Sequence, residues 1–137
     1  MIVGFTGTQQ TITFAQRRQI VDMAQMFDEF HEGDCIGADA TCAVLVKQEN
    51  PGCKVVSHPP ANPSKRAYAP ADEVRQPKPY IERNHDIVDE CDILIATPKG
   101  FKEERRSGTW ATIRYAKKVS KPIIIVFPDG TFAEYNT

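Results

Sequence analysis

Residues 80–118 read YIERNHDIVDECDILIATPKGFKEERRSGTWATIRYAKK and predict a helix, a buried strand and a second helix in succession. In the first part, 80–89, apolar residues recur at the spacing of one helix face. The apolar run at 92–96 predicts the strand, and RSGTW at 106–110 opens the second helix. The centre of the chain therefore predicts one unit of an α/β protein with a parallel sheet.

The loop between that strand and the second helix is the first candidate for ligand binding. In a parallel α/β protein, such a loop directs backbone N–H groups of the next helix toward a ligand, and these groups favour an anion. Ser107, Gly108 and Thr109 are therefore candidates for binding a phosphate. Asn84, on the apolar stripe of the preceding helix, needs a polar partner inside the protein.

Toward the N-terminus, MIVGFT at 1–6 predicts the first strand, and GTQQ at 7–10 predicts the turn after it. A glycine permits close backbone approach and a threonine supplies a hydroxyl, as phosphate and ribose sites require. The alternative is a plain turn from strand to helix.

A capping box of Thr13 and Gln16 predicts the start of an amphipathic helix. Its apolar residues continue at three- and four-residue steps as far as Phe30, and Gly33 is placed to end the helix with a left-handed cap.

GDCIGAD at 33–39 predicts a second junction, from a very short strand into a helix over 38–48. Asp39 falls in the first turn of this helix, where the helix dipole favours a carboxylate. Asp39 is therefore either an N-terminal helix charge or an acceptor of a hydrogen bond from a ribose or a base.

After a third strand at 54–57, the segment 58–79 is rich in proline and has no helical or strand periodicity. Ordinary connections in α/β units have about 2–6 residues. We therefore expect either a lid over a ligand site or an insertion, and favour the lid. His58, Lys65 and Arg66 are candidate ligand contacts in it, with a surface role as the alternative.

The apolar run at 123–127 predicts a fifth strand, and 131–137 a short tail. Strands that alternate with helices predict an α/β fold: one Rossmann-like three-layer domain over 1–137 with helices on both faces of the sheet. We expect a mainly parallel five-stranded sheet of order 3-2-1-4-5. The loops 7–10 and 97–108 then border one crevice, where a nucleotide would bind.

Composition narrows the classes of function. The chain has 137 residues, 41% of them hydrophobic, and a formal net charge of −1, which gives no support for coating nucleic acid or a membrane. No apolar run is long enough to span a bilayer and no signal segment is recognised, so we expect a cytoplasmic protein. The four cysteines form no C-x-x-C pair, and we expect reduced core residues and no metal site.

Four short motifs together resemble the SLOG superfamily of Rossmann-like proteins. They are GFTGT at 4–8, GxxxGAD at 33–39, the Arg-Asn pair at 83–84, and SGT at 107–109. The superfamily includes the LOG ("lysine decarboxylase-like") phosphoribohydrolases, the DprA/Smf-type DNA-processing proteins and molybdenum-cofactor carrier proteins. The resemblance covers residues 2–127 and implies a domain that binds a nucleotide or nucleotide-derived ligand, commonly as a homodimer or higher homo-oligomer.

LOG enzymes cleave the N-glycosidic bond of nucleoside monophosphates with an arginine and the glutamate of a P-G-G-x-G-T-x-x-E motif. The resemblance places Arg83 at the arginine, but Thr112 stands where the glutamate is expected and the P-G-G is missing. An oxocarbenium-like transition state needs a carboxylate nearby. A hydrolase with this sequence would have to use a relocated carboxylate, such as Asp39, Glu103 or Glu104.

Two functions therefore stay open, and the missing glutamate favours the first. The first is binding of a nucleotide-derived ligand, as a carrier, sensor or sponge, at the loops 6–10, 33–39 and 97–109. The second is nucleotide N-glycoside hydrolysis, for which Arg83, Asp39 and Glu104 are the candidate catalytic residues. Binding of single-stranded DNA is disfavoured by the neutral charge and the few loop aromatics. The predicted ligand-binding residues are Gly4, Thr6, Gly7, Thr8, Gly37, Ala38, Asp39, His58, Arg83, Asn84, Pro98, Lys99, Ser107, Gly108 and Thr109.

Overall fold

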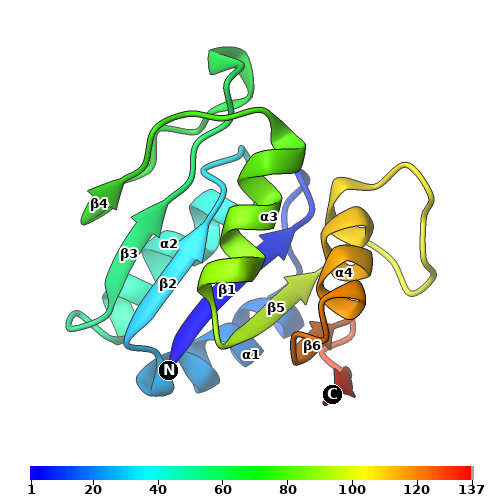
Figure 1. Ribbon diagram of the computed structural model, residues 1–137. Coiled ribbons are helices and arrows are strands. Elements are labelled where there is room, and N and C mark those ends of the chain that lie inside the picture. Colours follow the sequence, from blue (N-terminus) through cyan, green and yellow to red (C-terminus); the bar gives the residue numbers. More distant parts are fainter. Residues whose placement is uncertain (137) are drawn as a thin grey trace.

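One sheet runs through the centre of the computed structural model, which describes residues 1–136 (Figure 1). In these residues it has seven strands in the order β4-β3-β2-β1-β5-β6-β7. The strands are β1 (Ile2–Gly7), β2 (Glu29–Glu32), β3 (Lys54–Ser57), β4 (Glu73–Val74), β5 (Ile93–Thr97), β6 (Ile123–Val126) and β7 (Phe132–Tyr135). The pairs from β4 to β6 are parallel, and β7 is antiparallel to β6.

Helices cover both faces of the sheet and make three layers (Figure 1). The helices α1 (Phe14–Met23) and α2 (Ala38–Glu49) pack on one face, and α3 (Tyr80–Glu90) and α4 (Gly108–Lys118) on the other. Successive side chains of a strand point to opposite faces. Accordingly, Ile95 of β5 packs with the α1 and α2 side, whereas Leu94 and Ala96 pack with Val88, Trp110 and Ile113 of α3 and α4. None of the helices in residues 1–136 is long and apolar enough to cross a membrane.

The predicted α/β class, three layers and mainly parallel sheet are confirmed, but the five strands and the order 3-2-1-4-5 are wrong. Two further strands, β4 and β7, form the edges. Strand β4 has two residues within the proline-rich segment. Strand β7 lies in the predicted tail, whose last residue, Thr137, is outside the described residues. Edge strands are short and partly exposed, so their sequences carry little of the apolar signal of a central strand.

The predicted helix up to Phe30 is also wrong in its second half. The capping box of Thr13 and Gln16 starts α1 as predicted, but α1 ends at Met23. A short 3-10 turn, η1 (Ala24–Met26), follows, and then β2. Phe27 and Phe30 are buried in the same core cluster, Phe27 from the loop after η1 and Phe30 from β2. Their spacing continues the helical period by coincidence.

The proline-rich segment 58–79 is bound to the edge of the sheet beside β3. Asp34 accepts hydrogen bonds from the Ala69 backbone N–H at 3.0 Å and from Arg66 Nε at 3.0 Å, and a 3-10 turn, η2 (Pro63–Lys65), precedes Arg66. The backbone N–H of Arg75 donates to the carbonyl of Ser57. That this segment closes over a ligand stays a prediction.

Candidate functional site

A cavity of about 680 Å³ lies where the order of the sheet reverses, beyond the C-terminal ends of β1 and β5. In open α/β sheets, ligands bind at this position. Pockets for small molecules have about 300–1,000 Å³, so the cavity has the size of a nucleotide-like ligand. Its lining residues come from the end of β1, from the loops after β1, β2 and β5, and from the helices α2, α3 and α4.

The structure brings most of the predicted site residues together at this cavity. Those that line it are Thr6, Gly7, Thr8, Asp39, Arg83, Asn84, Lys99, Glu104, Ser107, Gly108 and Thr109. Gly4, Gly37, Ala38, His58 and Pro98 do not line it. That the lining residues contact a ligand stays a prediction.

Three of the predicted residues shape the loops from outside the cavity. A Cβ on Gly4 would lie 2.9 Å from Cys91 Sγ, so Gly4 permits α3 to pack closely on β1. A Cβ on Gly7 would lie 2.5 Å from the Cβ of Ala38, which shows that Ala38 packs against the end of β1. The carbonyl of Pro98 accepts a hydrogen bond of 2.8 Å from Gln16 Nε2. Gly4 and Ala38 therefore have a packing role and Pro98 accepts a hydrogen bond, while contact of these three residues with a ligand stays a prediction.

His58 is placed away from the cavity and is 97% buried against His31. It belongs to a second cavity, described below. Lys65 and Arg66 do not line the main cavity either.

The N-terminus of α4 faces the main cavity with free backbone donors. Ser107 is its N-cap, and the Ser107 hydroxyl accepts a hydrogen bond of 3.2 Å from the Trp110 N–H. The first N–H groups of a helix have no partner within the helix. Those of Gly108 and Thr109 are therefore available to an anion, and the helix dipole adds to the attraction.

The loop after β1 is held in one conformation by Thr8. The Thr8 N–H donates to the carbonyl of Thr97 at 3.1 Å, and the Thr8 carbonyl accepts from Ala38 at 2.9 Å. The Thr8 hydroxyl accepts from the Gln10 N–H at 3.0 Å. Its own hydrogen stays available for a ligand.

Arg83 lines the cavity and is 95% buried. Its Nη1 donates to the carbonyls of Gly33 at 2.5 Å and His58 at 3.2 Å, and its Nε donates to Asn84 Oδ1 at 2.7 Å. Asn84 thereby has the inward partner that its position on α3 requires. The partner of Nη2 is Cys35 Sγ at 3.6 Å, a weak acceptor, so Nη2 is the part of the guanidinium available to a ligand.

Three carboxyl groups are buried at the end of β2 and the start of α2, those of Glu32, Asp34 and Asp39. Asp39 Oδ2 accepts hydrogen bonds from the backbone N–H groups of Gly33 at 3.1 Å and Cys35 at 3.3 Å, and so fixes the loop after β2. Burial raises the pKa of Asp39 to about 6, against the lowering effect of Arg83. Burial and the charges of Asp39 and Asp34 also raise the pKa of Glu32 well above its ordinary value.

The difference in stability between Asp39→Asn and the natural protein is expected to shift in favour of the variant as the pH rises from about 4 to 8. The folded protein keeps the proton on Asp39 up to a higher pH than the unfolded chain does. The stability that this proton contributes to the folded state is therefore lost as the pH rises through about 6. Asparagine does not titrate and shows no such loss. The rise of the pKa from 3.8 to about 6 corresponds to about 3 kcal/mol. Urea denaturation of both proteins at pH 4 and pH 8 measures the effect, and a difference independent of pH would contradict it.

The rim of the cavity carries opposite charges. Lys99 Nζ lies 3.6 Å from Glu104 Oε1, and both side chains are about half exposed. Arg106 also lines the cavity. The lining therefore includes three cationic side chains, those of Arg83, Lys99 and Arg106, and two acidic ones, those of Asp39 and Glu104.

Several lining residues are not among those predicted from the sequence, above all Tyr80 and Ile81. Both belong to the helix predicted over 80–89, whose apolar spacing indicates a buried face, but they are 39% and 72% exposed and lie at the cavity. The ring of Tyr80 is 5.1 Å from the guanidinium carbon of Arg83. No local pattern distinguishes these two residues from the other apolar residues of α3, because their exposure depends on how far the helix extends past the sheet. Phe5, Ile87 and Ala111 also line the cavity and were not predicted. The remaining lining residues belong to the predicted loops 6–10, 33–39 and 97–109 but were not named one by one, and they are Gln9, Gln10, Gly33, Cys35 and Arg106.

Fold and cavity together define a Rossmann-like α/β protein with room for a ligand at the switch point of its sheet. The molybdenum cofactor binding protein from the phototrophic bacterium Rippkaea orientalis is similar, with a TM-score of 0.69 and 19% identity over 92% of this chain and 76% of that one. The X-ray structure of TM1055, a structural genomics target, has a TM-score of 0.61 and 18% identity over 90% of this chain and 72% of that one. At such identities the likeness shows the fold alone, a Rossmann-like α/β fold. No protein-family model matches the chain, and no curated protein matches it.

Proposed function

We propose that the protein binds a phosphorylated, nucleotide-derived small molecule in the main cavity, as a carrier, sensor or sponge. The observation that carries this proposal is the N-terminus of α4, whose N–H groups at Gly108 and Thr109 line a cavity of about 680 Å³. An anion there meets the helix dipole, and Lys99 and Arg106 of the same cavity add positive charge. Tyr80 and Ile81 offer an aromatic and an aliphatic surface to the flat rings of the ligand.

The molybdenum cofactor is the first ligand to test, because a protein of the same fold is described as binding it. Adenine and guanine nucleotides are the second group, because the switch point of Rossmann-like sheets accommodates them. The position of Thr112 supports binding in preference to hydrolysis. Thr112 is buried, and its hydroxyl donates to the Gly108 carbonyl at 2.9 Å, so it braces α4 and supplies no carboxylate.

Hydrolysis of a nucleotide N-glycosidic bond is the second candidate, and the pKa of Asp39, raised to about 6, favours it. A carboxyl with such a pKa can donate a proton near neutral pH. Asp39 lines the cavity beside Arg83, and Glu104 is the other carboxylate of the lining. Release of free base from nucleoside monophosphates by the pure protein would support this activity, and its loss in Asp39→Asn would assign it to this site.

Gly108→Val is expected to weaken binding of a 5′-nucleotide roughly tenfold or more, which corresponds to about 1.4 kcal/mol. A Cβ on Gly108 would meet no atom within 4 Å, so the valine fills cavity space beside the N–H groups and leaves the core unchanged. Isothermal titration with adenosine and guanosine monophosphate measures the affinity, and thermal unfolding measures the stability.

Gly100→Val is the matched control, because a Cβ there also meets no atom within 4 Å and Gly100 does not line the cavity. It should bind the nucleotide as the natural protein does. A Gly108→Val protein with natural affinity for the nucleotides would show that the phosphate is bound elsewhere.

A further inference from the structure

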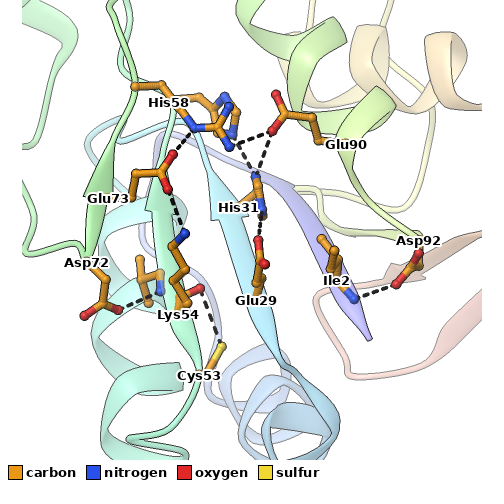
Figure 2. Close-up of polar contacts among 12 residues, drawn as sticks. Ile2, Glu29, His31, Cys53, Lys54, His58, Asp72, Glu73, Glu90 and Asp92 are labelled. Atoms are coloured by element: carbon orange, nitrogen blue, oxygen red, sulfur yellow. Dashed lines mark hydrogen bonds and ion pairs between the residues drawn. The ribbon is translucent and has the colours of Figure 1, made fainter.

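Two buried histidines and a glutamate meet beneath α3, outside the main cavity (Figure 2). His31 belongs to β2, His58 follows β3, and Glu90 is the last residue of α3. One possible ligand atom of each lies within 4.8 Å of the others. His31 Nδ1 is 2.8 Å from His58 Nε2 and 3.9 Å from Glu90 Oε1. Three donor atoms from three separate elements therefore point at one place.

Glu29 orients His31, one of the two buried histidines of this cluster. His31 Nε2 is 2.8 Å from Glu29 Oε1, two residues earlier on the same strand (Figure 2). A carboxylate at this position holds the proton on Nε2 and leaves the lone pair of Nδ1 directed at His58 and Glu90. Histidines that bind metals almost always donate their second nitrogen to such a carboxylate or carbonyl.

We propose that His31, His58 and Glu90 bind a divalent metal ion of the zinc class, through His31 Nδ1, His58 Nε2 and a carboxylate oxygen of Glu90. Two imidazoles and one carboxylate form a donor set that suits Zn²⁺, and three protein ligands leave a fourth position open to water or a small ligand. The contact of 2.8 Å between the two rings is a hydrogen bond. A metal ion would take the place of the proton in this hydrogen bond and bind His31 Nδ1 and His58 Nε2.

A second cavity, of about 320 Å³, gives this site an entry path. His58 and Glu90 line it together with Arg75, Gln76, Lys78, Arg83 and Asp86. It therefore has room for a metal and its water beside His58 and Glu90, whereas His31 does not line it. Arg83 lines both cavities and donates to the His58 carbonyl at 3.2 Å, so the proposed metal site and the ligand site share one side chain.

Arg75 competes with the metal for Glu90. Arg75 Nη2 is 2.8 Å from Glu90 Oε1, and Arg75 Nε pairs with Glu73. The guanidinium keeps Glu73 as its partner when it releases Glu90. Removal of Arg75 should therefore free the Glu90 carboxylate and reduce the positive charge near the metal.

The test is titration of Zn²⁺ into chelator-treated, tag-free protein by calorimetry, with Co²⁺ absorption as a second readout of tetrahedral coordination. The natural protein should bind about one ion. Affinity for Zn²⁺ should fall more than tenfold in His58→Asn and in Glu90→Gln, and roughly 10- to 100-fold in Glu29→Gln, where the orienting carboxylate is lost. Arg75→Gln should bind Zn²⁺ more tightly than the natural protein.

His85→Gln is the matched control, because His85 stacks on Tyr115 at 3.7 Å between ring centroids and is not part of the cluster. It should bind Zn²⁺ as the natural protein does. Circular dichroism checks the fold of each variant. The expected gain in Zn²⁺ affinity in Arg75→Gln cannot arise from unfolding. Absence of Zn²⁺ binding, or binding that survives both His58→Asn and Glu90→Gln, overturns the site.

Discussion

Gly37→Val is expected to lower the free energy of unfolding by about 3–5 kcal/mol. Gly37 precedes α2 with φ 108°, a conformation that side chains other than glycine rarely adopt. A Cβ there would lie 2.5 Å from the backbone carbonyl of Gln9. The backbone of the loop after β1 would have to move, and this loop lines the main cavity. Natural domains are stable by about 5–15 kcal/mol, so the variant should be largely unfolded well below the natural melting temperature.

Thermal and urea denaturation measure this loss. Gly100→Val is the control, since Gly100 has no positive φ and a Cβ there meets no atom within 4 Å. It should unfold within about 0.5 kcal/mol of the natural protein, as surface substitutions usually do. Equal stability of the two variants would contradict the close approach of Gly37 to Gln9. Gly37 does not line the main cavity but packs closely against Gln9 of the loop that does, and its predicted contact with a ligand stays a prediction.

The elements that the sequence predicts correctly are those in which apolar residues repeat at a regular spacing. The centre of the chain, 80–118, gave the correct succession of helix, strand and helix because each element repeats its own apolar spacing. Phe27 and Phe30 wrongly predict a longer helix because they are core residues at helical steps, although the chain has left the helix before Phe27. The edge strands β4 and β7 depend on pairing with a neighbour, which no local pattern encodes.

The candidate site was predictable to the level of loops. The rule that ligands bind where the strand order reverses selects the loops after β1 and β5 without any side-chain information. Tyr80 and Ile81 were missed because their exposure depends on how far α3 extends past the sheet. His31, His58 and Glu90 were missed as a set because three elements bring them together, and their spacing matches no short metal motif.

The packing around Arg83 explains why Gly33 is a glycine. A Cβ on Gly33 would lie 2.4 Å from Arg83 Nη1 and 2.9 Å from Asp39 Oδ2. The guanidinium therefore rests directly on the backbone of the loop after β2, between that loop and α3. This position gives Arg83 two roles, one in holding the loop and one toward a ligand.

Arg83→Met is expected to lower the free energy of unfolding by about 3–5 kcal/mol. The carbonyls of Gly33 and His58 lose their donor, and the buried carboxyl of Asp39 loses the nearby charge that lowers its pKa. Because the pKa of Asp39 then rises further, the loss should be larger at pH 8 than at pH 4. Urea denaturation at the two pH values measures both effects. A loss below about 1 kcal/mol at pH 8 would show that Arg83 does not stabilise the loop.

Arg83→Lys separates the role of Arg83 in ligand binding from its role in holding the loop after β2. Lysine keeps the charge but cannot reproduce the planar fork of donors. In this structure Nη1 and Nε are used by the protein, and Nη2 is left for a phosphate. We therefore expect Arg83→Lys to weaken binding of a 5′-nucleotide by more than it weakens binding of the matching nucleoside, by about 1.5–3 kcal/mol for the charge-assisted hydrogen bond. Arg114→Lys, paired with Glu103 outside the cavity, should leave both affinities unchanged. Equal losses for nucleotide and nucleoside in Arg83→Lys would mean that Arg83 only holds the loop, and the phosphate would then depend on the N-terminus of α4 alone.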